Sequence, residues 1–418
     1  MKLNKREFLK LSSLSTAALV TGSAGAADDD ALSDITGDTA PIAPEEHEAR
    51  IRKAQSLMQQ QDIDAILLEG GTSMTYFTGL RWGRSERLTG IVIPRDGQIG
   101  IVTPYFEEPK ARERLPLDAE YHTWHEHESP FQRVAELLAD RGLKGGRLGI
   151  EETVRFFIVD GIREAAPEVG IVSATPVTAG CRMFKDEHEI ALMKKANEIT
   201  LRAYMHVYER LELGMTPADV TGMMREAQGR LGGQGIWGMA LFGKASAYPH
   251  GTNAPQAIRE GQIVLMDCGC SVHGYRSDIS RTFVFGEANK RQREVWNTVR
   301  KGQQTVYETA KIGTPAGAVD DAVRGFYESL GYGPGYQTPG LSHRTGHGIG
   351  MDIHEHVNFV HGEKTPLAPG MCLSNEPGLY NFDEFGVRVE DCLYMSDDGP
   401  NWFTLPPDSI DEPMGSLL

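Results

Sequence analysis

The chain has little of two features that quickly define a protein class, namely regularly spaced cysteines and long apolar runs. Its five cysteines among 418 residues are an odd number without regular spacing: Cys181, Cys268, Cys270, Cys372 and Cys392. This argues against a disulfide framework, and we expect small buried apolar residues instead. Beyond the first 26 residues, no apolar run reaches the roughly 20 residues that a membrane-spanning helix needs.

Positive charge is also scarce, because 42 Lys and Arg stand against 58 Asp and Glu, giving a formal net charge of −16. Nucleic acids and anionic membrane surfaces both require a basic surface on their partner. We therefore expect neither as a partner of this protein. Solubility accounts for most of the carboxylates, and neutralisation of bound cations is the alternative role for some of them.

Residues 1–26 have the three parts of an export signal peptide: a basic head, a short apolar middle from Leu9 to Val20, and an exit of small residues. The middle is too short to span a bilayer. The stretch KREFLK resembles the twin-arginine export consensus, with Lys5 in place of the first arginine. We expect export to the periplasm or the extracellular space, with a flexible acidic leader at residues 27–46. A disordered or interfacial N-terminus is the alternative.

The pattern of apolar residues predicts two domains, as the length of the chain suggests. A small α/β domain is expected over residues 47–179, because helical and β-rich runs alternate there. The runs lie at residues 48–61 (helix), 65–68, 89–94, 99–104, 131–143 (helix) and 147–150.

The second domain is expected over residues 180–408, with a C-terminal tail at 409–418. It begins with long helices at 186–211 and 216–231, the second with Thr216 as N-cap and Pro217 at its first position. β-rich runs follow at 263–269, 279–285, 371–378 and 387–395, with two more helices between the second and the third. The whole chain is therefore predicted to be α+β.

Four acidic residues occur at the ends or on one face of predicted strands: Asp267, Asp278, Glu376 and Glu390. A buried unpaired carboxylate is costly, so each needs a cation, a proton or hydrogen bonds. Any one alone is more typical of a cap, a turn or a solvated strand. Together with a histidine, such hard oxygen ligands suit a pair of divalent ions, which can share a nucleophile.

The segment 341–356, LSHRTGHGIGMDIHEH, contains four histidines among glycines. Histidine serves both as metal ligand and as acid or base, so the segment alone leaves both roles open. Its glycines argue against a helix and allow the backbone to approach a ligand closely.

The ordered motifs MDCGCSVHGYRSDISRT, TGHGIGMDIHE, NEPGLY and VRVED closely resemble the pita-bread metallopeptidases, in the branch of aminopeptidase P and prolidase. The resemblance covers roughly residues 47–408 and includes a creatinase-type N-terminal domain with the segment YFTGL. It implies a pita-bread catalytic domain preceded by a smaller creatinase-like α/β domain. Dimers are common in this family, so a homodimer is expected.

The resemblance implies two divalent metal ions, Mn²⁺ first, with Co²⁺, Fe²⁺ or Zn²⁺ as alternatives. Asp267 would bind the first ion, and His347 and Glu376 would complete the second. Asp278 and Glu390 would bridge both.

The resemblance also implies roles around the metals. Glu376 would be the proton shuttle, His354 would stabilise the intermediate, and His250 would be a second candidate acid across the cleft. His343 would line the proline-side pocket, with Tyr380 and Arg388 near the substrate. An ion pair that orients Glu390 is an equal alternative for Arg388.

The expected function is that of a metallo-exopeptidase, a hydrolase that cleaves the bond before proline in peptides with proline second. Alternatives on the same fold are a creatinase-like hydrolase or lyase for a small amidine, amide or sulfonium compound, and a non-catalytic peptide-binding domain. His356 is expected to be an exposed loop histidine. The tract with His122, His125 and His127 is expected to be a surface loop. A metal site, or contact with a neighbouring subunit's cleft, is the alternative for that tract.

Overall fold

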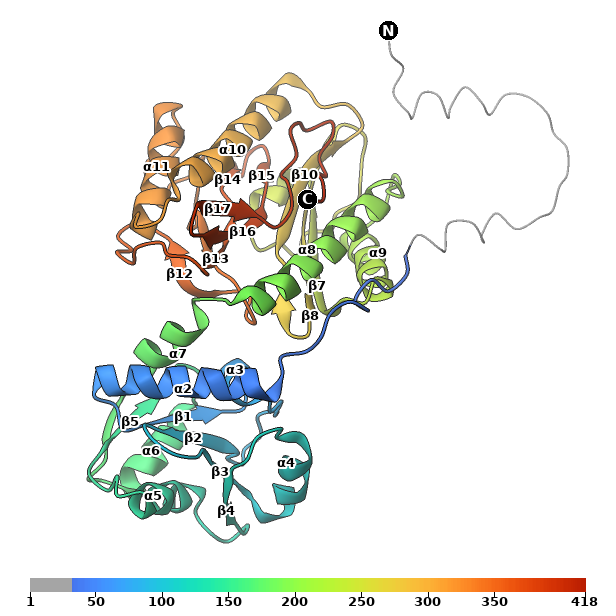
Figure 1. Cartoon of the computed structure of the whole chain (residues 1–418). Helices are drawn as coiled ribbons and strands as arrows, with labels where there is room; N and C mark the ends of the chain where they lie inside the picture. Colours follow the sequence, from blue (N-terminus) through green and yellow to red (C-terminus); the bar gives the residue numbers. More distant parts are fainter. Residues whose placement is uncertain (1–31) are drawn as a thin grey trace, which may run out of the picture. The chain divides into compact units, whose positions relative to one another are not determined.

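The computed structural model describes residues 32–418 (Figure 1). The expected signal peptide at residues 1–26 and the start of the leader lie outside the described residues. Residues 34–418 cluster as one unit, and both domains of the chain belong to it. Within the described part of the chain, no helix combines the length and the apolar character needed to cross a bilayer.

The N-terminal domain is built on a six-stranded sheet in the order β4-β3-β2-β1-β5-β6. Strands β1, β2 and β3 are antiparallel neighbours, whereas β4, β5 and β6 join in parallel. The strands are β1 (Ala65–Glu69), β2 (Gly90–Pro94), β3 (Gly100–Pro104), β4 (Glu120–Trp124), β5 (Arg147–Ile150) and β6 (Gly170–Ser173).

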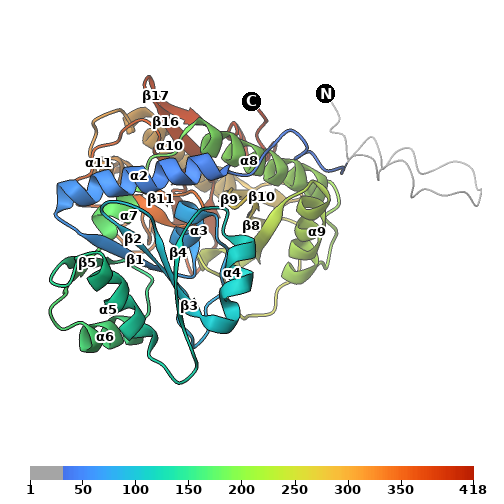
Figure 2. The same cartoon turned by 60° about the horizontal axis from the view of Figure 1, so that its bottom comes forward.

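Helices cover both faces of this sheet, which explains why its central strands are apolar throughout (Figures 1 and 2). Alternate residues of a strand face opposite sides. In β1, Ile66 and Leu68 pack with α2, α3 and α7, whereas Leu67 packs with α5 and α6. The helices are α2 (Pro44–Gln61), α3 (Thr72–Thr78), η2 (Tyr105–Glu107), α4 (Glu108–Arg114), α5 (Pro130–Asp140), α6 (Phe156–Ala165) and α7 (Thr175–Arg182). Helix α7 spans the expected domain boundary at residue 179.

The C-terminal domain begins with two capped helices, α8 (Glu187–Tyr208) and α9 (Pro217–Arg230). Asp186 caps α8 and Thr216 caps α9, each in a reciprocal capping box, so the expected Thr216 cap is confirmed. The helices pack on a sheet in the order β10-β8-β7, to which β9 is added. Its elements are β7 (Gln234–Phe242), η3 (Gly243–Ala247), β8 (Gln262–Val272), β9 (Tyr275–Arg276) and β10 (Ile279–Phe285).

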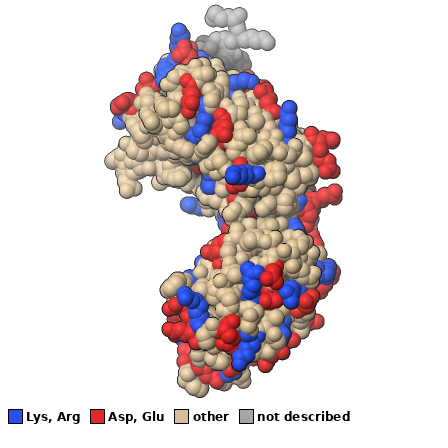
Figure 3. Space-filling model, turned by 90° about the vertical axis from the view of Figure 1, so that its left-hand side faces the viewer, with Lys and Arg blue, Asp and Glu red and all other residues tan. Residues whose placement is uncertain are grey.

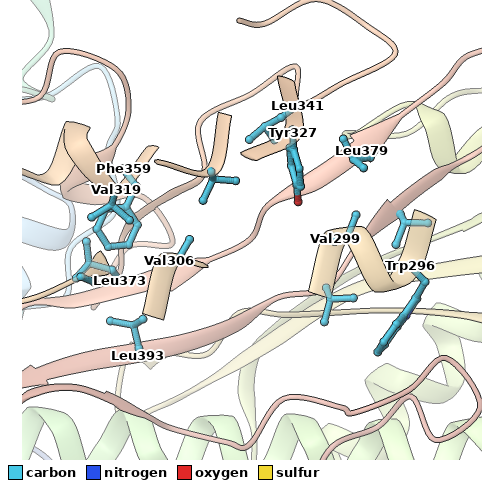
Figure 4. Packing of buried hydrophobic residues seen from close by; sticks show 14 of the residues in the cluster. Trp296, Val299, Val306, Val319, Tyr327, Leu341, Phe359, Leu373, Leu379 and Leu393 are labelled. Carbon is cyan, nitrogen blue, oxygen red and sulfur yellow. The ribbon is translucent and has the colours of Figure 1, made fainter. Parts of the chain in front are cut away.

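The second half of this domain has a five-stranded sheet, β12-β11-β13-β16-β17, and a separate pair, β14-β15. Helices α10 and α11 bury Trp296, Val299 and Val319 against its strands (Figure 4). The elements are α10 (Lys290–Thr309), α11 (Ala316–Ser329), β11 (Gly346–Gly348), β12 (Glu355–Phe359), β13 (Cys372–Asn375), β14 (Gly378–Tyr380), β15 (Gly386–Arg388), β16 (Asp391–Ser396) and β17 (Gly399–Trp402).

The single strand expected over residues 387–395 is wrong. The structure has β15 and β16 in different sheets, with Val389 and Glu390 between them. At this break the Glu390 N–H donates to the Ser280 carbonyl, and the Arg281 side chain donates to the Glu390 carbonyl. The alternation of apolar and polar residues therefore continues through a change of partner strand. Residues 387–393 are all buried, so neither face is solvated at the break.

Two further expectations from the sequence concern the cysteines and the set of helices and strands. All five cysteines are free and buried, as expected. Strands β4, β6 and β7 and the short helices α3, α4 and α6 were not expected. Lysine and arginine side chains are interspersed with acidic ones on the face drawn in Figure 3.

Substitution of Leu373 tests whether the packing of β13 stabilises the C-terminal domain. It is fully buried between Gly348 of β11 and Leu393 of β16. We expect Leu373→Ala to lower the free energy of unfolding by about 2–5 kcal/mol, because it leaves a cavity in the core. Chemical denaturation measures this. Leu213→Ala, at a side chain 64% exposed, is the control and should change stability by less than about 0.5 kcal/mol. Equal effects of the two changes would contradict the packing argument.

Candidate metal centre and active site

Strand pairing brings the predicted ligands together. Asp267 lies in β8 opposite Ser280 of β10, and Asp278 lies just before β10. His347 is in β11, which pairs with β13. Glu376 directly follows β13 and Glu390 directly precedes β16, its partner strand. Five strands between residues 262 and 396 therefore bring these polar side chains to one place.

His347 and the carboxylates around it form a compact group. Its Nε2 atom lies 3.3 Å from Glu376 Oε1 and 3.6 Å from Asp278 Oδ2. One ligand atom each from Asp278, His347 and Glu390 lie within 4.8 Å of one another. Within residues 32–418, this is the one group of three or more such side chains that could hold an ion.

The imidazole of His347 is oriented as a ligand. Its Nδ1 lies 3.0 Å from the Gly348 carbonyl oxygen, which can only accept, so Nδ1 carries the proton. Burial, followed by the charge of His354, lowers the His347 pKa to about 3, so the ring is neutral. The Nε2 lone pair therefore points at carboxylate oxygens, an arrangement that is repulsive unless a cation or a proton lies between them.

The carboxylates need the same compensation. Asp278 Oδ1 and Glu390 Oε1 are buried and have no hydrogen-bond partner. Burial and then the neighbouring carboxylates raise the pKa of both groups well above the ordinary value. Oxygen-rich donors with one imidazole suit Mn²⁺, Co²⁺, Fe²⁺ or Zn²⁺. The residues present thus fit a divalent metal ion.

Arg388 offsets part of the negative charge. Its Nη2 donates to Asp267 Oδ2 at 2.6 Å, and its Nε donates to Ser280 Oγ at 2.8 Å. The Nε of Arg388 also lies 3.7 Å from Glu390 Oε2. The ion pair considered for Arg388 and Glu390 is therefore present, but Asp267 is the closer partner.

Two serines of the site were not predicted. Ser280 Oγ lies 2.6 Å from Glu390 Oε2 and 3.0 Å from Asp267 Oδ1, so it can donate to either carboxylate. Ser374 accepts from the His347 N–H at 2.9 Å and lies 3.4 Å from Glu376 Oε1. Their only signal in the sequence is their position beside or opposite a ligand on a neighbouring strand, which requires the register to be known.

The remaining predicted residues surround this cluster. His354 is exposed, and its ring lies edge-on to His347 with centroids 4.3 Å apart. His343 Nε2 lies 2.7 Å from Tyr380 Oη, which also accepts from Arg388 at 3.2 Å. His250 is exposed and follows η3. No described residue forms a hydrogen bond or an ion pair with His250. Burial is the main cause of the lowered pKa values of His343 and His354, and the nearby His250 contributes to both.

The loop that carries His354 is anchored by buried charges. Glu355 Oε2 accepts from Lys185 at 2.8 Å, and Oε1 accepts from Arg182 at the end of α7 and from the Met351 N–H. Arg182 also binds Asp352, whose other oxygen accepts from Thr72 of α3 at 2.6 Å. Elements of the N-terminal domain therefore fix a loop of the catalytic site.

A cavity of about 150 Å³ lies beside that loop. Its wall includes His354 together with Glu152 and Arg182. The cavity leaves room for a ligand next to the imidazole.

Two of the three histidines in the N-terminal tract lie in a surface loop, as expected, and the third does not. His125 and His127 are exposed in the loop after β4, with their rings stacked at 5.9 Å, as expected. His122 is half-buried within β4, so the expectation of a loop is wrong for it. His356 is exposed as expected, but it belongs to β12 rather than to a loop.

Comparison with known proteins agrees with this geometry. The model of metallopeptidase family M24 matches residues 191–397, and that of the creatinase/prolidase N-terminal domain matches residues 50–184. A Xaa-Pro dipeptidase from Lactobacillus delbrueckii subsp. lactis is 30% identical over 84% of this chain and 95% of its own length. The chain belongs to metallopeptidase family M24.

Solved structures of the M24 family have the same two-domain fold. A prolidase from Thermococcus sibiricus superposes with a TM-score of 0.79 at 27% identity, covering 87% of this chain and 97% of that one. An X-Pro aminopeptidase from Thermotoga maritima gives 0.74 at 25% identity, covering 86% and 98%. The expected creatinase-like and pita-bread domains are thereby confirmed, as is a hydrolase of the peptidase class.

Removing one buried carboxylate should stabilise the metal-free M24 site. Asp278 has a raised pKa, so its ionisation in the folded state costs stability as the pH rises above its ordinary pKa. We expect Asp278→Asn to stabilise the EDTA-treated protein at pH 7 by about 1–3 kcal/mol, and to reduce the further stabilisation by added Mn²⁺. Thermal unfolding with and without the metal measures both effects. Asp140→Asn, at the exposed end of α5, is the control. Destabilisation of the metal-free variant would contradict the unpaired-carboxylate argument.

The Glu355 anchor predicts acid sensitivity. Burial alone would raise the pKa of Glu355. The charges of Lys185 and Arg182 outweigh burial and lower this pKa to about 2, from an ordinary 4.5. The stabilisation is therefore complete above pH 4.5 and is lost as the pH falls toward 2, by about 3 kcal/mol.

Glu355→Gln should flatten that part of the stability–pH curve. It should also cost about 3–5 kcal/mol at pH 7, because two buried cations lose their partner. Denaturant unfolding at pH 7 and at acid pH measures both. Glu126→Gln breaks the exposed pair with Arg87 and should leave stability nearly unchanged, because solvent screens exposed ion pairs. An unchanged pH slope in Glu355→Gln would contradict the assignment.

Proposed function

We propose that this protein is an exported, dinuclear metal-dependent exopeptidase that hydrolyses the bond before proline in Xaa-Pro peptides. The observation that carries the proposal is the unprotonated Nε2 of His347 among buried carboxylate oxygens without partners. Such a cluster needs a cation or a proton to offset its repulsion, and Glu376 and His354 lie at its edge.

Charge balance supports two ions rather than one. Asp267, Asp278, Glu376 and Glu390 carry four negative charges when ionised, and Arg388 supplies one positive charge among them. A single divalent ion near His347 would leave an excess of negative charge in a buried site, which is unfavourable. A second ion beside Asp267 removes this excess. Mn²⁺ is our first choice among ions that accept oxygen donors and one imidazole.

Bound divalent ions would supply Lewis acidity, which lowers the pKa of a water molecule and polarises the scissile carbonyl. The residues of the chain do the remaining work. In the metal-free site, burial raises the pKa of Glu376 to about 7, so this carboxyl can take up or release a proton near neutral pH. Glu376 would deliver that proton to the leaving nitrogen. His354 would donate a hydrogen bond to the carbonyl oxygen as negative charge develops on it.

The pocket for proline would be formed by His343 and Tyr380. Burial, followed by the charge of Arg388, lowers the pKa of His343 to about 3, so its imidazole is neutral at physiological pH. The two rings lie 5.3 Å apart and present aromatic surface that suits an apolar pyrrolidine ring. His250, on an exposed segment, is a candidate second proton donor.

The names of the relatives support this substrate class. The Lactobacillus protein is a Xaa-Pro dipeptidase, the Thermococcus protein is a prolidase and the Thermotoga protein is an X-Pro aminopeptidase. We transfer to this chain what they share, which is a proline following the scissile bond. The signal-like residues 1–26 support export, by a route that resembles the twin-arginine type. A homodimer is part of the same proposal.

Metal content and peptide cleavage test the proposal together. We expect two ions per chain in the Mn²⁺-loaded mature protein, and cleavage of Ala-Pro or Ala-Pro-Ala that chelation abolishes. Two ions without cleavage of either peptide would favour a small-molecule hydrolase or lyase instead. No metal and no activity would favour a peptide-binding domain.

Replacement of Glu376 tests its role in proton transfer. We expect Glu376→Gln to retain the fold and to reduce kcat by about 10²- to 10⁴-fold, measured at saturating Mn²⁺ with metal content determined in parallel. Glu308→Gln, on the surface of α10, is the control. Full turnover by Glu376→Gln would remove this residue from the mechanism.

A further inference from the structure

Arg344 is a cation of the site that the proposed mechanism does not use. It lies between His343 and His347, and its Nη1 donates to Asn358 Oδ1 at 2.9 Å. Asn358 is the residue of β12 directly opposite His347 in the β11–β12 pair. Directly opposite residues of paired strands project to the same face. The guanidinium of Arg344 is therefore held on the face of the sheet that carries the metal ligand.

The electrostatics agree with this placement. Burial is the main influence on the pKa values of His347, His354 and Glu376, and the positive charge of Arg344 lowers each of them. Arg344 thus acts on the ligand, on the residue that faces the carbonyl and on the proton shuttle.

Arg344 has no anionic partner in the described part of the chain, where its one side-chain hydrogen bond is to the neutral amide of Asn358. The buried arginines of this domain each pair with a carboxylate: Arg281 with Asp391, Arg324 with Asp320 and Arg388 with Asp267. Of the half-buried ones, Arg300 donates to a backbone carbonyl, as a structural arginine can, whereas Arg344 donates to a side-chain amide on the face of the metal site. A guanidinium has five N–H donors in a fork that matches a carboxylate. The half-buried Arg344 has most of this fork available to a ligand.

The sign of the charge selects the end of the substrate. Arg344 would attract a carboxylate and repel the ammonium group of a peptide. In an Xaa-Pro dipeptide, the free carboxylate is attached to the carbon next to the scissile nitrogen. A cation held on the face of the sheet that carries His347 is therefore placed for that carboxylate. In a longer peptide, a neutral amide occupies the same position.

We propose that Arg344 binds the free α-carboxylate of a dipeptide substrate and makes the site selective for dipeptides over longer peptides. This inference rests on the proposed Xaa-Pro peptidase function and assigns its subclass. A charge-assisted, two-pronged hydrogen bond to a carboxylate is stronger than a bond to a neutral amide carbonyl. Selectivity then arises mainly in substrate binding.

The test compares substrates that differ in this charge alone. The Mn²⁺-loaded wild type should cleave Ala-Pro with a kcat/KM about 10- to 100-fold higher than Ala-Pro-amide, and Ala-Pro-Ala should behave like the amide. In Arg344→Met the ratio should fall to about 1, through a higher KM for Ala-Pro, with the amide changed by less than about threefold. Arg344→Lys should be intermediate, because it keeps the charge without the fork.

Controls separate this role from a structural one. Arg300→Met removes another half-buried arginine, bonded to the Pro407 carbonyl, and should keep the wild-type ratio. The ratio within one variant does not depend on how much of it is folded. Equal loss of activity toward both peptides in Arg344→Met, or equal cleavage of both by the wild type, would overturn the inference.

Calorimetry of the Mn²⁺-loaded protein with L-proline and L-prolinamide gives a readout besides turnover. Preference for proline in the wild type and its loss in Arg344→Met would support a carboxylate site even if neither peptide were cleaved, an outcome in which the proposed function alone fails. Equal binding of the two compounds, or no binding of either, together with no cleavage, would overturn the carboxylate site as well.

Discussion

The structure depends on one electrostatic constraint, which is that several carboxylates and a neutral imidazole share a buried space. Asp278 and Glu390 each leave one oxygen without a hydrogen-bond partner, and His347 directs a lone pair toward them. Groups so arranged repel one another, and only a proton or a metal ion relieves the repulsion. This repulsion lowers the stability of the metal-free fold, and the same repulsion favours the binding of a cation.

The surrounding fold resists that repulsion by fixing the backbone on every side. Behind the ligands, the fully buried pair of Arg281 and Asp391 joins β10 to β16, and Arg281 also donates to the Glu390 carbonyl. Ser280 and Arg388 bridge carboxylates of different strands. Rigid strands and saturated polar neighbours keep the ligand atoms in place, which is what affinity and preorganised chemistry both require.

Much of this arrangement was predictable from the sequence, and the limit is instructive. The predicted ligands Asp267, Asp278, His347, Glu376 and Glu390 occur in motifs whose order carries the information, and the long amphipathic helices have clear periodicity and caps. The break between Val389 and Glu390 was not predictable, because burial on both faces removes the contrast between apolar and polar positions. Ser280 and Arg344 owe their roles to cross-strand register and to a missing counter-ion. Neither property is visible in a linear sequence.

The anchoring of the His354 loop by Arg182 and Lys185 has a consequence for the chain as a whole. Those contacts span the junction between the two domains, and the charges involved are poorly hydrated where they lie. Separating the domains would expose a carboxylate and two cations that now satisfy one another, and it would release the loop beside the metal ligands. The stability of the two domains is therefore coupled, and a disturbance of α7 reaches the loop that carries His354 without any contact with substrate.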